Sequence, residues 1–357
     1  MADLKIFTDR IEPEAMAQID RLLKQSAFKN SKIRIMPDVH KGMGCVIGFT
    51  GNLGDKVIPN IVGVDIGCGL VTAKLGKIEL DLKELDCIIN KHIPSGFKTH
   101  NERIVRFKEL TKLKCYRSLN DTKRLERSIG TLGGGNHFIE VAKDLEDNLY
   151  LVIHTGSRNL GKQVAEYYQK LAIKTCKVDI PSDLAYLTGT DREDYLHDMN
   201  ICLEFASLNR KTILDLICKH ANLKVIDSFE TIHNFIDTDS NIVRKGAISA
   251  KSDEILTIPI NMRDGSIIGI GLGNSDWNYS APHGAGRIMS RMKAKKTLNY
   301  NKFKVSMKDV YSTSVNIKTL DEAPFVYKPI NEILDNVTDT IKIIKIIKPI
   351  YNFKASN

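Results

Sequence analysis

The sequence lacks several features that mark specialised classes of protein. Its seven cysteines are an odd number and contain no C-x-x-C pair, which argues against a disulfide scaffold. No apolar run is long enough to span a bilayer. There is also no internal repeat, no low-complexity linker and no abrupt change of composition. These absences predict one large continuous domain over residues 1–357 and no membrane partner.

Acidic residues are fewer than basic ones. The 52 Lys and Arg residues outnumber the 43 Asp and Glu residues, which gives a net charge of +9 and a pI near 9.0. Such an excess favours a polyanionic partner such as nucleic acid, although lysine can also serve only to keep a chain in solution. The first residues, Met1 to Lys5, show no signal-peptide pattern. Together with the unpaired cysteines, this predicts a protein of the reducing cytoplasm. We also expect a monomer.

Hydrophobic periodicity predicts both helices and strands. Helical spacing of apolar residues occurs at 13–26, 162–176, 198–221 and 331–335, and residues 79–128 form a long, charged and largely helical stretch. Strand-like runs occur at 33–36, 45–49, 71–75, 150–153 and 340–353. Asn209 falls within the apolar stripe of the 198–221 helix. A buried amide needs hydrogen-bond partners, so Asn209 either caps a neighbouring loop or belongs to a site.

A carboxylate and a thiol stand three residues apart in a glycine-rich turn. Asp65 and Cys68 are surrounded by Gly63, Gly67 and Gly69, which permit the positive φ angles of a sharp reversal. Such a turn can direct both side chains into one cavity, as a metal or nucleophile site requires. Taken alone, the pattern also fits a turn aspartate beside a buried and inert cysteine.

Four histidines stand beside glycine or small polar residues at the ends of apolar strands. They are His137, His154, His233 and His283. With Asp65 and Cys68 they supply carboxylate, thiolate and imidazole donors, which suit a transition metal: either one Zn²⁺, or two ions such as Mn²⁺. The sequence does not choose between these metals. The other histidines in charged or helical contexts are assigned to the surface or to ordinary packing: His92, His100, His197 and His220.

Two glycine-rich stretches can bind phosphate. Residues 131–136 and 283–287 offer clustered backbone N–H groups, and the second stretch is followed by a predicted helix. Both stretches also fit plain tight turns. Arg287 and Arg291 would lie one turn apart on that helix, with Arg158 near the same place. These arginines could bind phosphates in a bidentate manner or form surface ion pairs.

Six motifs together resemble the RtcB-type RNA-splicing ligases. They lie at 36–40 (Met-Pro-Asp-Val-His), 63–69, 133–140, 154–158, 244–247 and 283–287, and the resemblance runs from about Ile33 to Lys354. It implies a single large α+β domain of mixed β-sheets with flanking helices around a deep metal-containing cleft. It also implies GTP- and Mn²⁺-dependent joining of an RNA 3′-phosphate or 2′,3′-cyclic phosphate to a 5′-hydroxyl, in RNA repair or tRNA splicing.

The resemblance assigns a role to each matching residue. Cys68 would be shared between two Mn²⁺ ions, with Asp65 and His137 on one ion and His154 and His233 on the other. His283 would be the nucleophile that carries GMP. The residues implied in GTP binding are Asn136, Phe138, Glu140, Asn234, Asn261, Met262, Ser266, Gly284, Ala285, Gly286, Tyr327 and Lys354.

Within that set, Glu140 would accept hydrogen bonds from guanine N1 and N2, Lys354 would donate to O6, and Tyr327 would stack near the base. The residues implied in RNA binding are Arg158, Arg287 and Arg291, and Arg210, Arg244 and Lys245 are expected to extend the same basic cleft.

One segment departs from the family pattern. Residues 259–263 read Pro-Ile-Asn-Met-Arg where the family has Pro-Gly-Ser-Met-Gly, so the loop is bulkier and more basic and its path is expected to differ. The chain is also shorter than usual for the family, and it ends in Lys-Ala-Ser-Asn where the family ends in Lys-Gly. These differences predict a divergent branch specialised for RNA repair. Two alternatives remain: a metal-dependent RNA phosphodiesterase, and a non-catalytic RNA-binding homologue.

Overall fold

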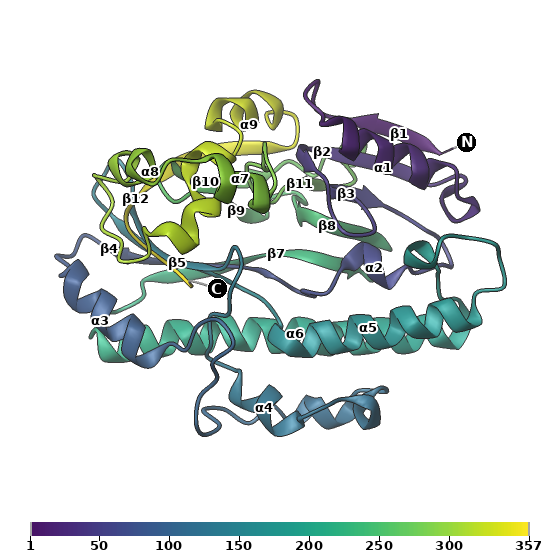
Figure 1. The fold of residues 1–357 in the computed structure, drawn as a ribbon, viewed down its shortest axis with the longest axis horizontal. Coiled ribbons are helices and arrows are strands. Elements are labelled where there is room, and N and C mark those ends of the chain that lie inside the picture. The colour runs from purple at the N-terminus through teal and green to yellow at the C-terminus, as the bar shows by residue number, and fades with distance from the viewer. Residues whose placement is uncertain (1, 356–357) are drawn as a thin grey trace.

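One mixed β-sheet runs through residues 2 to 355, the part of the chain that the computed structural model describes (Figure 1). Its strands follow the order β1-β2-β3-β8-β7-β4-β6-β5-β12-β10-β9, and β11 pairs with β8 beside this path. The pairing of β1 with β2 is parallel and the others are antiparallel. The strands are β1 (Asp3–Ile6), β2 (Lys32–His40), β3 (Ile47–Gly51), β4 (Gly69–Gly76), β5 (Phe138–Lys143), β6 (Leu149–Thr155), β7 (Asp227–Asp237), β8 (Ile242–Ser249), β9 (Ile255–Asn261), β10 (Gly265–Gly271), β11 (Ser280–Pro282) and β12 (Ile341–Lys354).

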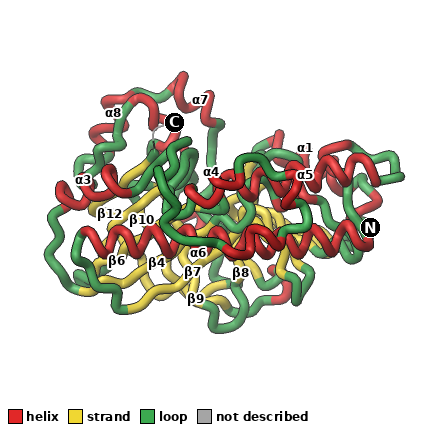
Figure 2. The backbone as a smooth tube through the Cα atoms, turned by 90° about the horizontal axis from the view of Figure 1, so that it is seen from below, coloured by secondary structure: helices red, strands yellow, loops and turns green. Residues whose placement is uncertain are grey.

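Helices flank this sheet on both sides. The α-helices are α1 (Pro13–Leu23), α2 (Pro59–Val62), α3 (Leu82–His92), α4 (Thr122–Arg127), α5 (Arg158–Thr175), α6 (Gly189–His220), α7 (Arg291–Thr297), α8 (Tyr300–Ser306) and α9 (Ile330–Asn336). Short 3-10 turns lie at Ser26–Phe28, Lys108–Lys112, Tyr116–Ser118, Ser182–Leu184, Ser275–Trp277, Ile317–Glu322 and Pro324–Val326. Helix α6 runs along one side of the sheet with α5 beside it, while α7, α8 and α9 lie on the other side (Figures 1 and 2). The α+β fold expected from the resemblance is therefore confirmed.

The central strands are buried on both faces. All seven residues of β6 are buried, and five of the six in β5 are. A strand covered on both sides needs apolar residues at consecutive positions, which explains why 150–153 reads as an unbroken apolar run. One apolar core lies between this part of the sheet and the helices α3 and α6, and it includes Leu85, Ile153 and Ile217. The ends of β4, β5 and β6 are thus held on a rigid base.

Most predicted elements are present with shifted ends, but two predictions were wrong and α8 was missed. Residues 79–128 are α-helical only in α3 and α4, because Pro94 and Gly96 follow α3 and the chain then runs through loops and 3-10 turns. Helix α6 begins at Gly189 rather than at residue 198. Helix α8 was not predicted. In the part that the structure describes, no helix is both long enough and apolar enough to cross a membrane.

Candidate metal centre and nucleotide cavity

Antiparallel pairing brings five of the predicted residues to one edge of the sheet. Gly69 at the start of β4 pairs with Thr155 at the end of β6 and with Ile232 in β7. Phe138 at the start of β5 pairs with His154. The turn before β4 carries Asp65 and Cys68, His137 precedes β5, and His233 follows Ile232. These side chains therefore meet, although their positions span 168 residues of sequence, from 65 to 233.

The donor atoms of these residues form two groups that share one sulfur. Asp65, Cys68 and His137 make one group, and Cys68, His154 and His233 make the other, with the donor atoms of each group within 4.8 Å of one another. Cys68 Sγ lies 3.4 Å from His137 Nε2 and 3.3 Å from His154 Nε2. His137 Nε2 also lies 3.0 Å from Asp65 Oδ2. Cys68 is thus the one residue common to the two groups.

The imidazole rings are oriented for ligation. His137 Nδ1 faces Leu132 O at 2.9 Å and His154 Nδ1 faces Asn136 O at 3.3 Å. A carbonyl oxygen only accepts, so Nδ1 carries a proton in both rings. A neutral ring of this tautomer has its lone pair on Nε2, the atom that lies near Cys68. His233 Nδ1 is buried and has no hydrogen-bond partner in the described chain. Converging lone pairs, a thiol and a carboxylate fit a pair of transition-metal ions.

Burial sets the protonation states of this cluster. Burial raises the pKa of the Cys68 thiol well above its ordinary value, and the nearby Asp65 charge adds to the rise. Burial alone would raise the pKa of Asp65 as well, but the hydrogen bond and charge of His137, the charge of Arg158 and the hydrogen bond of Cys68 together outweigh burial and bring that pKa to about 2. Burial lowers the pKa of His154 and His233 well below the usual histidine range. Neutral imidazole is the form that binds metal.

The turn that carries Asp65 and Cys68 depends on two glycines. Gly67 has a φ of +68°, which glycine adopts without strain. A Cβ on Gly156 would lie 2.2 Å from Asp65 Oδ1, so the absence of a side chain there allows the carboxylate to approach β6. Asn209 supports the adjacent loop, because its Oδ1 accepts from the N–H groups of Gly130 and Thr131 at 2.8 and 3.1 Å. Of the two roles considered for Asn209, the structure shows the loop cap.

Three of the residues expected in a basic RNA cleft are instead structural, and that expectation was wrong. Arg210 has 0% exposure; it donates to the carbonyl oxygens of Gly67 and Thr155 and pairs with Glu230. Arg244 also has 0% exposure and donates to Ser280 Oγ. Lys245 Nζ donates to two backbone carbonyls. Buried cations need such partners, which leaves none of the three free for a phosphate.

His283 lies next to the metal-ligand cluster and is held by Asp38. The His283 and His233 ring centroids are 4.8 Å apart. His283 Nδ1 lies 2.6 Å from Asp38 Oδ2, and the backbone N–H of His283 donates to the same oxygen at 3.2 Å. A carboxylate accepts from Nδ1–H, so the lone pair of His283 is on Nε2. Asp38 belongs to a motif noted in the sequence, but its role was not predicted because 245 residues separate it from His283.

A cavity of about 920 Å³ opens beside His283 and His154. Eleven of the twelve residues predicted to bind the nucleotide line it: Asn136, Phe138, Glu140, Asn261, Met262, Ser266, Gly284, Ala285, Gly286, Tyr327 and Lys354. Three buried polar atoms on its wall have no hydrogen-bond partner among the described residues, namely Glu140 Oε1, Ser266 Oγ and Asn352 Oδ1. Unpaired buried polar atoms are costly unless a ligand satisfies them.

Asn352 was missed from the sequence. Strand β12 pairs with β5 so that Asn352 faces Glu140 and Lys354 faces Phe138. Asn352 Nδ2 donates to Glu140 Oε2 at 2.8 Å. Burial raises the pKa of Glu140, whereas this hydrogen bond and the charge of Lys354 lower it. The effect of burial is larger, and the pKa is about 8. Lys354 Nζ lies 5.5 Å from the centroid of the Phe138 ring. A carboxyl group and an ammonium group therefore border the same part of the cavity.

Glu322 was also missed, and it holds several residues that line the cavity. This buried carboxylate accepts from Lys354 Nζ, from Tyr327 Oη at 2.7 Å and from Arg291 Nη1 at 2.6 Å, with Arg287 Nη1 at 3.4 Å. Burial would raise the pKa of Glu322, but the three cations lower it to about 2. No spacing in the sequence signals this residue, because its partners come from α7, from β12 and from two loops.

The prediction that Arg287 and Arg291 share a helical face was wrong. Helix α7 begins only at Arg291, and Arg287 lies in an extended bridge to Tyr327. Both arginines nevertheless line the cavity and share Glu322. Arg291 also donates to Asp321 at 2.7 Å and keeps 40% of its side chain exposed, whereas Arg287 keeps 13%. Arg291 is thus the more accessible of the two to solvent.

The altered segment 259–263 forms the end of β9 and a tight turn. Asn261 Oδ1 accepts from the N–H groups of Arg263 and Asp264 at 3.0 and 2.9 Å. Arg263 does not take a positive φ, which falls instead on Gly265. Ile260, which replaces a glycine of the family pattern, and the matching Met262 are buried in two apolar clusters. The hairpin between β9 and β10 therefore accommodates the residues that differ from the family pattern. Asn261 and Met262 line the cavity, as predicted.

Asn234 and Arg158 lie elsewhere. Asn234 is not among the residues that line the first cavity; its side chain connects Asp65 O, at 3.3 Å, to the Gly246 N–H, at 2.8 Å. Arg158 lines a second cavity, of about 450 Å³, together with Asp65 and His137. The expectation that Arg158 lies near Arg287 and Arg291 was wrong, because Arg158 lines the second cavity whereas Arg287 and Arg291 line the first.

The histidines assigned to ordinary packing are outside the site. His92 and His220 stack at the ends of α3 and α6 with ring centroids 3.6 Å apart. His197 is exposed and lies 3.0 Å from Asp198, and His100 Nε2 faces Gly130 O at 3.0 Å. This part of the sequence analysis is confirmed.

Comparison with known proteins identifies relatives along nearly the whole chain. The family described as "tRNA-splicing ligase RtcB" matches residues 21–120 and 112–355. An RNA-splicing ligase RtcB from Escherichia coli K12 is 31% identical over 410 aligned positions, which cover 99% of this chain and 98% of the relative. RNA-splicing ligase RtcB1 from another Escherichia coli strain is 30% identical with the same coverage. A tRNA-splicing ligase RtcB from Nanoarchaeum equitans is 27% identical and covers 88% of this chain and 85% of its own length.

Proposed function

This chain belongs to the RtcB family of tRNA-splicing ligases, and we propose that it joins an RNA 3′-phosphate or 2′,3′-cyclic phosphate to a 5′-hydroxyl, with GTP and two Mn²⁺ ions. One observation carries the proposal. His283 has its Nδ1 held by Asp38 at 2.6 Å and lies between the metal-ligand cluster and a cavity large enough for a nucleotide. A metal-ligand cluster alone would serve many reactions, but a carboxylate-held imidazole beside it supplies a nucleophile.

The metal ligands in this proposal are Asp65 and His137 for one ion, His154 and His233 for the other, and Cys68 for both. When bound, the two ions would polarise phosphate oxygens and neutralise negative charge that develops during transfer. The arrangement favours this assignment because the Nε2 atoms of His137 and His154 both face Cys68.

The reaction then follows from the orientation of His283. Its Nε2 lone pair attacks the α-phosphorus of GTP, a P–N bond forms, and the bond to pyrophosphate breaks so that pyrophosphate leaves with the electron pair. The ring becomes positively charged, and Asp38, which holds the Nδ1 proton, offsets that charge. An oxygen of the RNA 3′-phosphate next attacks the same phosphorus, and the electron pair returns to Nε2. Finally the 5′-hydroxyl oxygen attacks the activated RNA phosphate, its proton is released, and GMP leaves.

The cavity favours guanine over adenine. Guanine presents two N–H donors at N1 and N2 and an acceptor at O6, whereas adenine presents the opposite pattern at its C6 and N1 positions. Glu140, with its unpaired Oε1, would accept from the two donors, and Lys354 would donate to O6. Tyr327 and Phe138 would border the base. Mismatched polar groups in a buried pocket are rejected strongly, which is the physical basis for GTP selection.

RNA would meet the site from both cavities. Arg158 in the second cavity, and Arg287 and Arg291 in the first, are the proposed phosphate contacts. Asn234 is proposed to act on the nucleotide only indirectly, through its hydrogen bonds to Asp65 and Gly246. The seven free cysteines suit the reducing cytoplasm, where we place the protein as a monomer acting in RNA repair or tRNA splicing. That residues 1–357 fold as one domain stays a prediction, which the continuous sheet favours.

Labelling with GTP that is radioactive at its α-phosphate tests the proposal. With Mn²⁺, the wild-type protein should become labelled, His283→Ala should remain unlabelled while retaining bound Mn²⁺, and His197→Ala, on the exposed histidine, should behave as wild type. A nicked stem-loop with 3′-phosphate and 5′-hydroxyl ends should then be joined. A phosphodiesterase would instead cleave RNA without GTP and without a labelled protein. A non-catalytic RNA-binding homologue would bind RNA equally well with a chelator present.

A further inference from the structure

The net positive charge of this protein is concentrated in one segment. Residues 287 to 308 contain eight of the 52 Lys and Arg residues and none of the 43 Asp and Glu residues. This segment therefore accounts for eight of the nine net positive charges, and the remaining chain is close to neutral. The segment includes α7 and α8, which form a lobe beside β10 and β12 (Figure 1). We call residues 287–308 the basic lobe.

The charges of the basic lobe divide into two sets. Arg287 and Arg291 face inward and pair with Glu322. The other six are exposed lysines: Lys293, Lys295, Lys296, Lys302, Lys304 and Lys308. Among residues 2 to 355, Lys295 is the only one of these six that forms an ion pair, with Asp321 at 3.4 Å, and Lys302 lies 5.2 Å from the Phe325 ring. Four lysines thus direct uncompensated charge into solvent.

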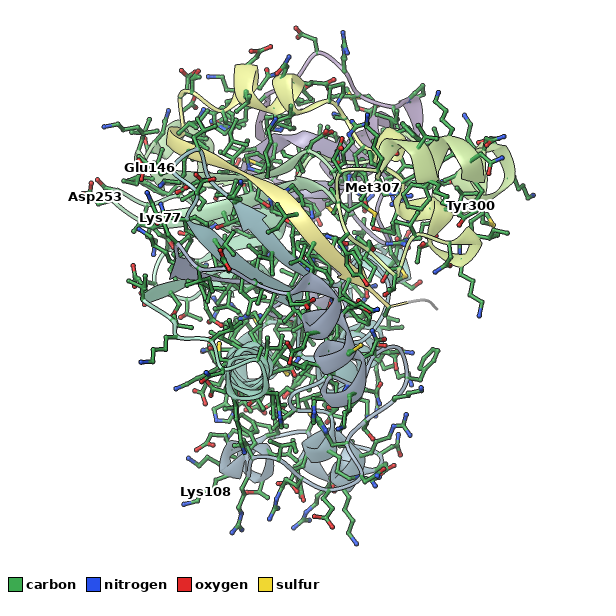
Figure 3. The ribbon with its side chains drawn as sticks, turned by 90° about the vertical axis from the view of Figure 1, so that its left-hand side faces the viewer. Lys77, Lys108, Glu146, Asp253, Tyr300 and Met307 are labelled. Atoms are coloured by element: carbon green, nitrogen blue, oxygen red, sulfur yellow. The ribbon has the colours of Figure 1, made fainter. Side chains whose placement is uncertain are left out.

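The fold of the basic lobe does not depend on these lysines. Phe303 and Met307 are buried against Leu320 and Met262 in a small apolar core. Ser290 caps α7, and Asn299 caps α8 by accepting from Lys302 N–H. In Figure 3, where Tyr300 and Met307 are labelled, the lobe projects from the side of the sheet and its side chains spread outward. The lysines are therefore carried on a structured surface that tolerates their substitution.

This surface continues the wall of the nucleotide cavity. Arg291 and Lys293 line the cavity together with His283. Six exposed like charges within 16 residues repel one another, and a polyanion relieves that repulsion and releases bound counterions. The position and sign of the charge therefore fit a phosphate backbone that ends near His283.

We propose that the basic lobe binds the backbone of the RNA strand that ends in the 3′-phosphate. The strand assignment rests on the proposed function, in which that phosphate must reach the GMP on His283, a residue that lines the same cavity as Arg291 and Lys293. The lobe holds the upstream phosphates through charge alone, so binding is independent of base sequence and sensitive to salt.

A triple variant of lysines that do not line the cavity tests this inference: Lys296→Gln, Lys304→Gln and Lys308→Gln. The matched control removes three exposed lysines from the helices on the far side of the sheet, Lys170→Gln, Lys174→Gln and Lys211→Gln, with the same change of net charge. Binding of a short single-stranded RNA ending in a 3′-phosphate is measured by fluorescence anisotropy over a range of salt concentrations. A second RNA of the same length carries 5′-hydroxyl and 3′-hydroxyl ends.

The lobe variant should bind the 3′-phosphate strand about tenfold more weakly at low salt, and its salt slope should fall by about two, since each phosphate contact on a single strand contributes roughly 0.7. Labelling of the protein by α-labelled GTP without RNA should be unchanged, and the KM for the 3′-phosphate strand should rise. The control triple should change the slope much less.

Equal losses in the lobe variant and the control would overturn the proposal, because net charge alone would then explain the binding. A loss confined to the 5′-hydroxyl strand would overturn the strand assignment. Failure of the wild-type protein to become labelled would refute the proposed ligase function, whereas the binding comparison would still decide whether the lobe contacts this RNA.

Discussion

The metal-ligand cluster and the Glu322 network both hold charge in the protein interior, but they satisfy it in opposite ways. In the cluster, a thiol, a carboxylate and three imidazoles face one another, and no Lys or Arg among the described residues donates a hydrogen bond to their metal-binding atoms. Glu322 instead forms ion pairs with Lys354, Arg287 and Arg291. The cluster is arranged to bind metal ions from solution, whereas in the network the cations are Lys and Arg side chains of the protein itself. The first should govern metal binding and catalysis, and the second stability and the shape of the cavity.

The largest effect is expected from Cys68→Ser. Because Cys68 belongs to both donor groups, its loss should remove both ions and abolish labelling by α-labelled GTP, while the thermal unfolding temperature of the metal-free protein stays close to that of the wild type. Metal content by atomic spectroscopy and labelling are the measurements. Cys87→Ser, on an exposed cysteine, is the control. Retention of both metal and labelling in Cys68→Ser would refute the shared-ligand assignment.

A smaller effect is expected from Asp38→Asn. The amide would keep the approximate position of the side chain but lose the charge that offsets a positively charged His283 ring, so the rate of GMP transfer to the protein should fall about 100-fold. Metal content and the dissociation constant for GTP should be nearly unchanged. Single-turnover labelling separates the two quantities. If GTP affinity fell in step with the rate, Asp38 would be shaping the cavity rather than acting through His283.

The pH dependence of GTP binding tests Glu140. Its pKa of about 8 means that the free protein carries a proton on this carboxyl below that pH. Guanine donors require the ionised form, so binding releases the proton, and affinity should rise about tenfold per pH unit toward pH 8 and level off above it. Glu140→Gln should give a flat profile. An equally steep profile in that variant would assign the proton to another group.

Glu322→Gln should affect stability more than metal binding. Loss of the buried charge leaves Lys354, Arg287 and Arg291 close together without their anion, which should destabilise the fold by about 3 kcal/mol and weaken GTP binding. Asp321→Asn, whose partners Arg291 and Lys295 are 40% and 45% exposed, should lower the unfolding temperature much less. Unchanged Mn²⁺ content in both variants would support the distinction between cluster and network. Loss of Mn²⁺ in Glu322→Gln would mean that the two regions are coupled.

The sequence predicted the metal-ligand cluster well because its signals are local. Glycine within two residues of a donor residue at the end of an apolar strand marks a turn that directs the side chain out of the strand, and this pattern occurs at Cys68, His137 and His154. Asn352 and Glu322 carry no such signal. Asn352 meets Glu140 only through the register of β12 on β5, across 212 residues. The sequence also does not predict which arginines are exposed, since Arg210 is fully buried while Arg291 lines the cavity and keeps 40% of its side chain exposed.

By itself, the sequence determined which chemistry the chain can perform, because donor atoms, glycine turns and apolar runs are fixed by residue type and short spacing. Only the tertiary structure decided which charges are available for that chemistry. A charged side chain that is buried away from water needs a partner within hydrogen-bond distance. In this fold that partner often comes from a strand or helix far away in the sequence. For this reason Arg210, Arg244 and Lys245 are buried and pair with groups of the protein interior, and Glu322 pairs with the cations that line the cavity. The net positive charge lies on the basic lobe.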